Sequence, residues 1–309
     1  MYESLKASDI DFYIYIFAFD DLCYEILKSI SLENANIISL EMFENKDLLA
    51  VKESRSRAEY FWTCTSSIIE YVLTNFRVPS CTYIDADLFF YRSPRVLLEE
   101  LSGAKSILIT EHRYSFLARH YEQKRAGRFC VQFITFLNTY DSKAVLSEWK
   151  TKCIDWCFDR YEDGKFGDQK YLDEWPGKCK NIQIMRHPGG GVAPWNIGLY
   201  RLLKDHNSLY VIERNTGRKY DLIFFHFHFV RFMENKDIDL GWNHIDKSVR
   251  ELIYYPYVRL ISETEKILSE LNKEYKPAYY LRKPKNLKEK IKSFIKNNLG
   301  YNILKSPII

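Results

Sequence analysis

The feature that most constrains the fold is an alternation of short apolar runs with amphipathic patterns of helical length. The runs have the length of β-strands and are "DFYIYIFAF", "NIISL", "CTYID", "KSILIT", "FCVQFITFL", "NIQIM" and "YDLIFFHFHF". Between several of them apolar residues recur at helical spacing, as from Ser54 to Phe76. Strands that alternate with helices predict an α/β fold with a mostly parallel sheet flanked by helices.

The chain is long enough to bury such a sheet. With 309 residues, of which 46% are hydrophobic and 16% aromatic, it can form one large α/β domain or two closely packed ones. Its uncharged apolar stretches are under half of the roughly 20 residues that span a bilayer, and the N-terminus lacks a secretion signal. The seven cysteines are an odd number within apolar or helical patterns, which favours reduced thiols and a cytoplasmic location.

Positive charge is concentrated at the C-terminal end. Residues 273 to 305 carry ten Lys or Arg and two Glu, a net of +8, which leaves −4 for the rest because the whole chain carries +4. We therefore predict a main domain over residues 1–272 and a basic amphipathic helical tail over residues 273–309. Nucleic acid is not expected as a partner, because the body of the chain is acidic.

Two interpretations of the tail remain open. The segment "LRKPKNLKEKIKSFIKNNLG" has apolar residues at helical spacing and lysines over the remaining surface. Such a helix can lie on an anionic membrane surface, which would place the protein peripherally on the inner face of the cell membrane. Alternatively, its apolar stripe packs on the main domain.

Two aspartates follow one of the predicted strands. Asp85 and Asp87 in "TYIDADLFFY" are two residues apart, so on a strand their side chains share one face. In open α/β sheets ligands bind beyond the carboxyl ends of the strands. Two neighbouring carboxylates repel unless a cation lies between them, and oxygen ligands suit Mg²⁺ or Mn²⁺ with diphosphate oxygens completing the shell. The alternative is that one Asp caps the turn and the other is solvated.

A second strand repeats the pattern with histidines. His226 and His228 in "FFHFHFV" share one face of an otherwise apolar run. A histidine in such a run is often only a satisfied core residue. Two of them at a strand end are candidate ligands, and a set of two aspartates and an imidazole favours Mn²⁺ over Mg²⁺.

Two further motifs are candidates for substrate contacts. Asp168 and Gln169 in "KFGDQKYLDEWP" follow a glycine turn, where they can face a reacting centre, or Asp168 can simply cap a helix. The segment "HPGGGVAPWN" combines three glycines, which allow close backbone approach, with the flat face of Trp195. It can equally be an irregular loop around a packed tryptophan.

Six segments in one order carry a resemblance to a known family. They are "SRAEYFWTCTSSIIEYVL" leading into "CTYIDADLFFYRSP", then "SILITEHRY", "KFGDQKYLDEWP", "HPGGGVAPWN" and "FFHFH". They resemble bacterial sugar transferases with the GT-A fold, which is Rossmann-like. More narrowly, they are similar to nucleotide-sugar transferases of capsule and lipopolysaccharide assembly, distant relatives of retaining glycosyltransferase family 8. The resemblance covers about residues 1–235.

The resemblance implies transfer of a sugar from a nucleotide diphosphate sugar, with UDP favoured, to a glycan or glycolipid acceptor. It implies that Asp85 and Asp87 hold Mn²⁺ or Mg²⁺ against the diphosphate, and that His226, with His228 as a second candidate, completes the metal shell. It implies a catalytic position for Asp168 and Gln169 beside the anomeric carbon. Further residues expected at the donor or substrate are Arg57, Tyr60, Glu111, His112, Gly190, Trp195 and Asn196.

The chain departs from the family pattern in two places. Family members have one more strand and a helix ahead of the segment that matches "YESLKAS", and that strand helps to hold the nucleobase. After the late histidine, this chain has "HFHFVRFMENKD" in place of a Gly and a Lys-Pro-Trp segment. A closing lysine therefore has no counterpart, although Arg231 is placed to serve.

Rival functions and the stereochemistry stay open. A phosphatase of the haloacid dehalogenase type also has Asp-x-Asp at a strand end, but it normally has Thr or Val where Phe89 stands here. An inactive nucleotide-sugar-binding or scaffold module is the other alternative. An inverting enzyme needs a carboxylate base, for which Asp168 or Glu111 would serve; the resemblance favours retention.

Overall fold

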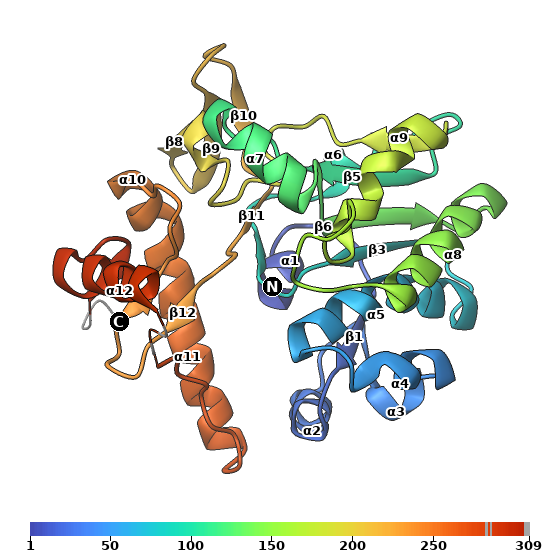
Figure 1. Ribbon diagram of the computed structural model, residues 1–309, viewed down its shortest axis with the longest axis horizontal. Coiled ribbons are helices and arrows are strands. Elements are labelled where there is room, and N and C mark those ends of the chain that lie inside the picture. Colours follow the sequence, from blue (N-terminus) through green and yellow to red (C-terminus); the bar gives the residue numbers. More distant parts are fainter. Residues whose placement is uncertain (282–283, 285, 306–309) are drawn as a thin grey trace.

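A computed structural model describes residues 1–281, 284 and 286–305. Residues 282, 283, 285 and 306–309 of the predicted tail lie outside the described residues. The chain is a mixed α/β protein, and Figure 1 shows its C-terminal helices, in orange and red, grouped on one side of the strands formed by earlier residues.

A four-stranded sheet with the order β3-β6-β5-β7 forms the centre of the first part of the chain. Its strands are β3 (Ser80–Ile84), β5 (Ile107–Glu111), β6 (Phe129–Leu137) and β7 (Ile182–Ile184). The expectation of a mostly parallel sheet is not met here, because β6 runs antiparallel to both β3 and β5, and only β5 and β7 pair in parallel. Glu111 at the end of β5 is the register partner of Phe129 at the start of β6, so the connection leaves and re-enters the sheet at the same end.

That connection is helical. The segment between β5 and β6 forms α7 (Phe116–Ala126) and turns into β6 at Gly127. A helix between two strands gives the same sequence pattern whether it crosses the sheet to a parallel strand or returns to an antiparallel one. Here α7 leads back into the antiparallel strand β6.

Helices α5 (Arg57–Asn75) and α8 (Tyr140–Asp155) pack on the central sheet. α5 begins at Ser56, whose hydroxyl accepts a hydrogen bond from the Glu59 amide while the Glu59 carboxylate accepts one from the Ser56 amide. This capping box fixes the start of the helix that lies beside β3. Trp149 of α8 is fully buried and stacks on Phe136 of β6.

A second, two-stranded parallel sheet comprises β1 (Ile14–Ala18) and β2 (Ala35–Ser39). It is bounded by α2 (Asp21–Ile30), α3 (Leu40–Phe43) and α4 (Lys46–Lys52). Buried residues of these elements and of α5 form one apolar cluster around Ile38, Leu48 and Cys64. Among the described residues, β1 pairs with β2 and not with β3.

One short strand pair joins distant parts of the sequence. β4 (Leu88–Phe90) pairs antiparallel with β11 (Phe224–His226), and His226 is the register partner of Leu88. Since β4 directly follows Asp85 and Asp87, this pairing places His226 beside the two aspartates.

The remaining elements complete the C-terminal half. A meander of β8 (Tyr200–Asp205), β9 (Ser208–Glu213) and β10 (Lys219–Asp221) precedes β11. β12 (Arg231–Phe232), β13 (Ile238–Asp239) and β14 (Ile303–Leu304) form a small sheet. The helices are α10 (Lys247–Val249), a π-helical turn (Arg250–Tyr254), α11 (Tyr255–Leu271) and α12 (Leu287–Leu299).

Short helices fill the connections: α1 (Tyr2–Lys6), α6 (Arg95–Leu98), a 3-10 helix (Gln169–Glu174), α9 (Trp175–Lys178) and a second 3-10 turn (Ile197–Leu199). Within the described part of the chain, every helix is too short or too polar to cross a lipid bilayer.

Candidate metal centre and cleft

Three side chains from two separate segments of the chain converge where β3 ends. Asp85 and Asp87 lie in the turn between β3 and β4, and His226 is the last residue of β11. The His226 Nε2 lies 3.1 Å from Asp87 Oδ1 and 3.7 Å from Asp85 Oδ2. One ligand atom from each residue lies within 4.8 Å of the other two.

These separations suit a divalent cation. Ligands about 2.1 Å from an octahedral ion lie about 3 Å from each other when they are adjacent. His226 is buried, whereas the side chains of Asp85 and Asp87 are 30% and 43% exposed, so one side of the group faces solvent. Such an arrangement supplies three protein ligands and leaves positions for oxygen atoms of a bound molecule.

Gln132 fixes the histidine ring. Gln132 lies on β6, is fully buried, and its Oε1 lies 2.6 Å from His226 Nδ1. The amide oxygen only accepts, so Nδ1 carries a proton and donates it, and Nε2 faces the carboxylates. Sequence reasoning missed Gln132. The available signal was one polar residue inside the apolar run "FCVQFITFL".

The aspartates are also positioned by neighbours. The Tyr83 hydroxyl donates to Asp85 Oδ1 at 3.0 Å, and the Asp85 amide donates to the Gln132 carbonyl at 3.0 Å. Burial raises the pKa of Asp85, and the repulsion of Asp87 adds to that rise. Burial also acts to raise the pKa of Asp87, but the charge and hydrogen bond of His226 outweigh it, and the pKa is lowered.

The pKa of the His226 imidazole is raised by the same two carboxylates. Burial alone would lower the pKa of the imidazole, but the adjacent Asp87 and Asp85 carboxylates raise it well above its usual value. Without a cation, the ring therefore holds a proton that neutralises part of the carboxylate charge. A divalent ion must displace that proton, so its binding competes with protonation of His226.

His228 lies next to the triad but outside the group of converging ligand atoms. Its ring centroid is 5.9 Å from that of His226 and 5.6 Å from that of Trp195. β11 ends at His226, so the alternation that put both histidines on one face stops there. Trp195 also meets His226 edge to face, and its indole N–H donates to the His112 carbonyl at 3.0 Å.

The triad opens into a large cleft of about 1380 Å³. Sites for one small molecule are typically about 300–1,000 Å³, so this cleft is larger than a site for one small molecule needs to be. Of the predicted site residues, the structure brings together around it Arg57, Asp85, Asp87, His112, Asp168, Gln169, Trp195, His226 and His228. Arg231 also lines it.

Asp168 reaches this cleft as a buried carboxyl group. Its backbone carbonyl accepts from the Trp149 indole N–H at 2.9 Å, which ties it to α8. Burial raises the pKa of Asp168 to about 7, opposed by the nearby Thr65 hydroxyl. Gln169 donates from Nε2 to the Ala126 carbonyl at 2.8 Å, so part of its hydrogen-bonding capacity is used by the end of α7.

The two residues expected near the nucleotide differ in their surroundings. Arg57 lines the cleft and pairs with Asp20 at 3.0 Å, with 74% of its side chain exposed. Tyr60 is buried in the α5 core and donates to Glu44 at 2.6 Å, outside the residues that line the cleft. Burial raises the pKa of Tyr60 far above its ordinary value.

Glu111 and His112 point to different environments. Glu111 pairs with Arg128 at 2.8 Å and is not among the residues that line the cleft. His112 lines the cleft, and its ring stacks on Tyr114 at 4.6 Å. Burial lowers the pKa of His112 to about 3, so its ring is neutral.

Gly190 and Asn196 lie beneath the cleft rather than in its lining. A Cβ at Gly190 would lie 2.6 Å from Met185 Sδ and 2.9 Å from a Leu97 methyl, so a larger residue there would have to displace these side chains. Asn196 is buried, and its Nδ2 donates to the carbonyls of His112 and Gly191. The hydrogen bonds of Asn196 hold the loop that carries Trp195.

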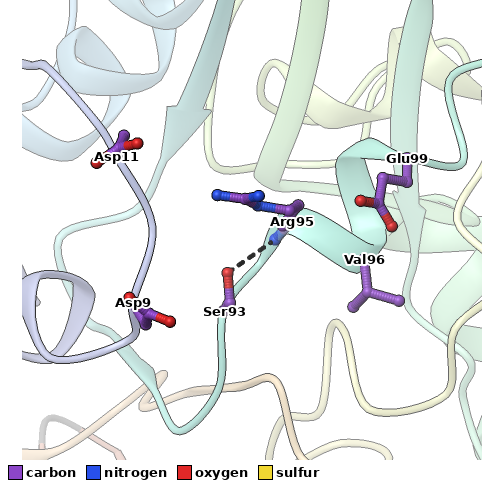
Figure 2. A pocket seen from close by; sticks show the side chains of 6 residues that line it. All are labelled: Asp9, Asp11, Ser93, Arg95, Val96 and Glu99. Atoms are coloured by element: carbon purple, nitrogen blue, oxygen red, sulfur yellow. Dashed lines mark hydrogen bonds between the residues drawn. The ribbon is translucent and has the colours of Figure 1, made fainter.

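A smaller cavity of about 440 Å³ adjoins the large cleft and shares Asp11 with it. Figure 2 shows Asp9 and Asp11 on one side, and on the other Arg95 of α6 and Glu99, which follows this helix. Its lining does not include the triad, and we do not assign it to the candidate site.

Comparisons with known proteins place the chain among relatives from Bacillus subtilis (strain 168). It is 28% identical to uncharacterized protein YfnD over 263 residues, which cover 84% of this chain and 82% of that protein. It is 30% identical to uncharacterized protein YfnF over 246 residues, 77% of this chain and 78% of that protein. No family model matches the chain.

Among solved structures, the apo form of mouse xyloside xylosyltransferase 1 matches 62% of this chain and 78% of its own, with 12% identity and a TM-score of 0.39. A likeness this distant carries no argument about activity. The match to YfnF extends over more than two thirds of both sequences, and the chain therefore belongs to the family of YfnF.

Proposed function

We propose that the chain is a metal-dependent glycosyltransferase. It would move a sugar from a nucleotide diphosphate sugar, with UDP favoured, to a glycan or glycolipid acceptor in surface polysaccharide synthesis. The observation that carries this proposal is the convergence of Asp85, Asp87 and His226 at the mouth of a cleft of about 1380 Å³. The motif resemblance supports the same assignment.

Each of the three residues has a defined part in this proposal. Asp85 and Asp87 supply oxygen ligands from their exposed side, and His226 supplies Nε2 with its orientation fixed by Gln132. A divalent ion held there, Mn²⁺ or Mg²⁺, would neutralise charge that develops on a departing nucleoside diphosphate.

Asp168 is the proposed catalytic group. It lines the same cleft, and a pKa of about 7 keeps part of it ionised at neutral pH. As a carboxylate it would stabilise positive charge on the sugar ring, with Gln169 beside it, and the proposal is of a retaining reaction. Trp195 would provide an apolar face on the other side of the triad.

The experiment is a screen of nucleotide sugars for release of the nucleoside diphosphate, with and without Mn²⁺. We expect metal-dependent release from at least one UDP-sugar and its loss in Asp87→Ala. Asp155→Ala is the matched control, because Asp155 is an exposed carboxylate at the end of α8. Phosphate release from sugar phosphates with no nucleotide requirement would favour a phosphatase, and binding with no turnover would favour a scaffold module.

A further inference from the structure

Helix α12 turns its apolar side outward. The side chains of Leu287, Ile291 and Phe294 are 74%, 53% and 60% exposed. Projected at about 100° per residue, the three lie within about 60° of one another, so they form a single strip along the helix. We call Leu287, Ile291 and Phe294 the apolar stripe. Because these three side chains are exposed, they do not pack on the main domain, as one of the two interpretations of the tail had expected.

The opposite side of α12 faces the protein through a lysine. Lys296 lies about 180° from Leu287 around the helix, and it is 1% exposed. Its Nζ lies 2.7 Å from Asp239 Oδ1 and 4.6 Å from the centre of the Trp242 ring, and it also donates to the Gly241 carbonyl. Lysine is almost never fully buried unless it is paired. Turning the stripe inward would expose this pair, so the buried lysine holds the stripe toward solvent.

The chain after α12 fixes the same orientation. β14 pairs with β13, which contains Asp239. Asn302 donates to the Gly241 carbonyl at 3.2 Å and accepts from Arg250 at 3.0 Å. Figure 1 shows α12 at the outer edge of the C-terminal helices. The helix is thus anchored at both its inner face and its C-terminal end.

Exposed lysines border the stripe on both sides. Lys290 lies on one side and Lys288 on the other, and both are exposed. This distribution, with apolar side chains flanked by cations, matches an anionic bilayer, because the long lysine stems let the ammonium groups reach lipid phosphates while the stripe enters the acyl boundary. It fits a second protein copy less well. Protein–protein interfaces are depleted in lysine, whereas exposed lysines lie on both sides of this stripe.

We propose that α12 docks the protein on an anionic membrane surface through Leu287, Ile291 and Phe294, with Lys288 and Lys290 on the lipid headgroups. The proposal rests on the geometry of α12 and does not depend on the proposed function of the cleft. The tail was open to two interpretations at the level of sequence, and the direction of the stripe favours this one.

The test is sedimentation of the full chain with vesicles of phosphatidylcholine alone or with added phosphatidylglycerol. We expect binding to the anionic vesicles, weakened by salt, and little binding to the neutral ones. The double variant Ile291→Ser, Phe294→Ser should weaken vesicle binding by about tenfold or more. Lys288→Gln with Lys290→Gln should weaken it on anionic vesicles only.

The control is Met42→Ser, which removes an exposed apolar side chain of similar size from α3. It should bind vesicles as the unaltered chain does. Because all the altered side chains are exposed, equal thermal melting of the variants would show that folding is intact. Unchanged vesicle binding in the Ile291→Ser, Phe294→Ser variant would overturn the proposal. The proposal would also be overturned if the unaltered chain were a dimer and the Ile291→Ser, Phe294→Ser variant a monomer, because a second copy would then cover the stripe.

Discussion

Replacing Gln132 with leucine tests how the candidate metal centre is organised. The amide of Gln132 accepts from His226 Nδ1 at 2.6 Å, and its side chain is fully buried, so water has no route to replace it. Without this acceptor the ring loses both its fixed tautomer and its orientation toward Asp85 and Asp87. Residues that hold a ligating histidine typically contribute 10- to 100-fold to metal affinity. We expect a loss of this size, equivalent to about 1.4–2.7 kcal/mol of binding free energy.

The assay is calorimetric titration of Mn²⁺ into the metal-free protein at fixed pH. Gln132→Glu keeps an acceptor at the same position and should bind Mn²⁺ more tightly than Gln132→Leu. Gln183→Leu is the control, because Gln183 is a buried glutamine on β7 that donates to the Ile184 carbonyl away from the triad. If folded Gln132→Leu binds Mn²⁺ as tightly as the unaltered chain, Gln132 does not position His226.

Three other predictions follow from single groups. Mn²⁺ affinity should rise with pH by up to tenfold per unit while His226 is protonated, because the ion displaces that proton; an affinity independent of pH in calorimetry would contradict this. The raised pKa of Asp168, about 7, means that the unfolded chain loses the proton first. The free energy of unfolding should therefore fall as the pH rises from about 4 to 7, by at most about 1.4 kcal/mol per pH unit. Urea unfolding at several pH values should show that Asp168→Asn lacks this decrease. Lys296→Met removes the cation that neutralises buried Asp239 and should lower the free energy of unfolding by about 3 kcal/mol, whereas Lys292→Met, at an exposed position, should change it by less than about 0.5 kcal/mol.

The metal candidates were accessible from sequence because two aspartates directly follow an apolar run of strand length. In the structure Asp85 and Asp87 lie in the turn between β3 and β4 rather than on a strand, and the pairing of β11 with β4 brings His226 to them. The two-residue alternation of β11 does not extend to His228, because the strand ends at His226 and the backbone turns at Phe229, where φ is 65°. Gln132 could not be assigned, because its role depends on the pairing of β6 with β3, which a local pattern does not encode.

Strand direction was the main misjudged property of the fold. The sequence alternation predicts the strands β5 and β6 but not the helix α7 between them, and whether this connection crosses the sheet or returns depends on contacts far apart in the chain. The tail shows the same limit. Helical spacing identified the apolar residues of α12, but the buried pair of Lys296 with Asp239 decides which side of the helix meets the protein.

The large cleft is lined by consecutive residues of both β1 and β3, among them 14–17 and 80–84. Consecutive side chains point to opposite faces of a strand, so residues from both faces of β1 and of β3 line the cleft. The cleft therefore runs along the edges of these two strands.

The central claim is that Asp85, Asp87 and His226 hold a divalent cation that binds a nucleoside diphosphate. The most direct measurement is calorimetric titration of UDP into the protein with Mn²⁺ or with a chelator, for the unaltered chain, Asp87→Ala and Asp155→Ala. We predict that UDP binds the unaltered chain and Asp155→Ala only when Mn²⁺ is present, and that Asp87→Ala does not bind it. UDP binding that persists in the chelator or is unchanged in Asp87→Ala would contradict the claim.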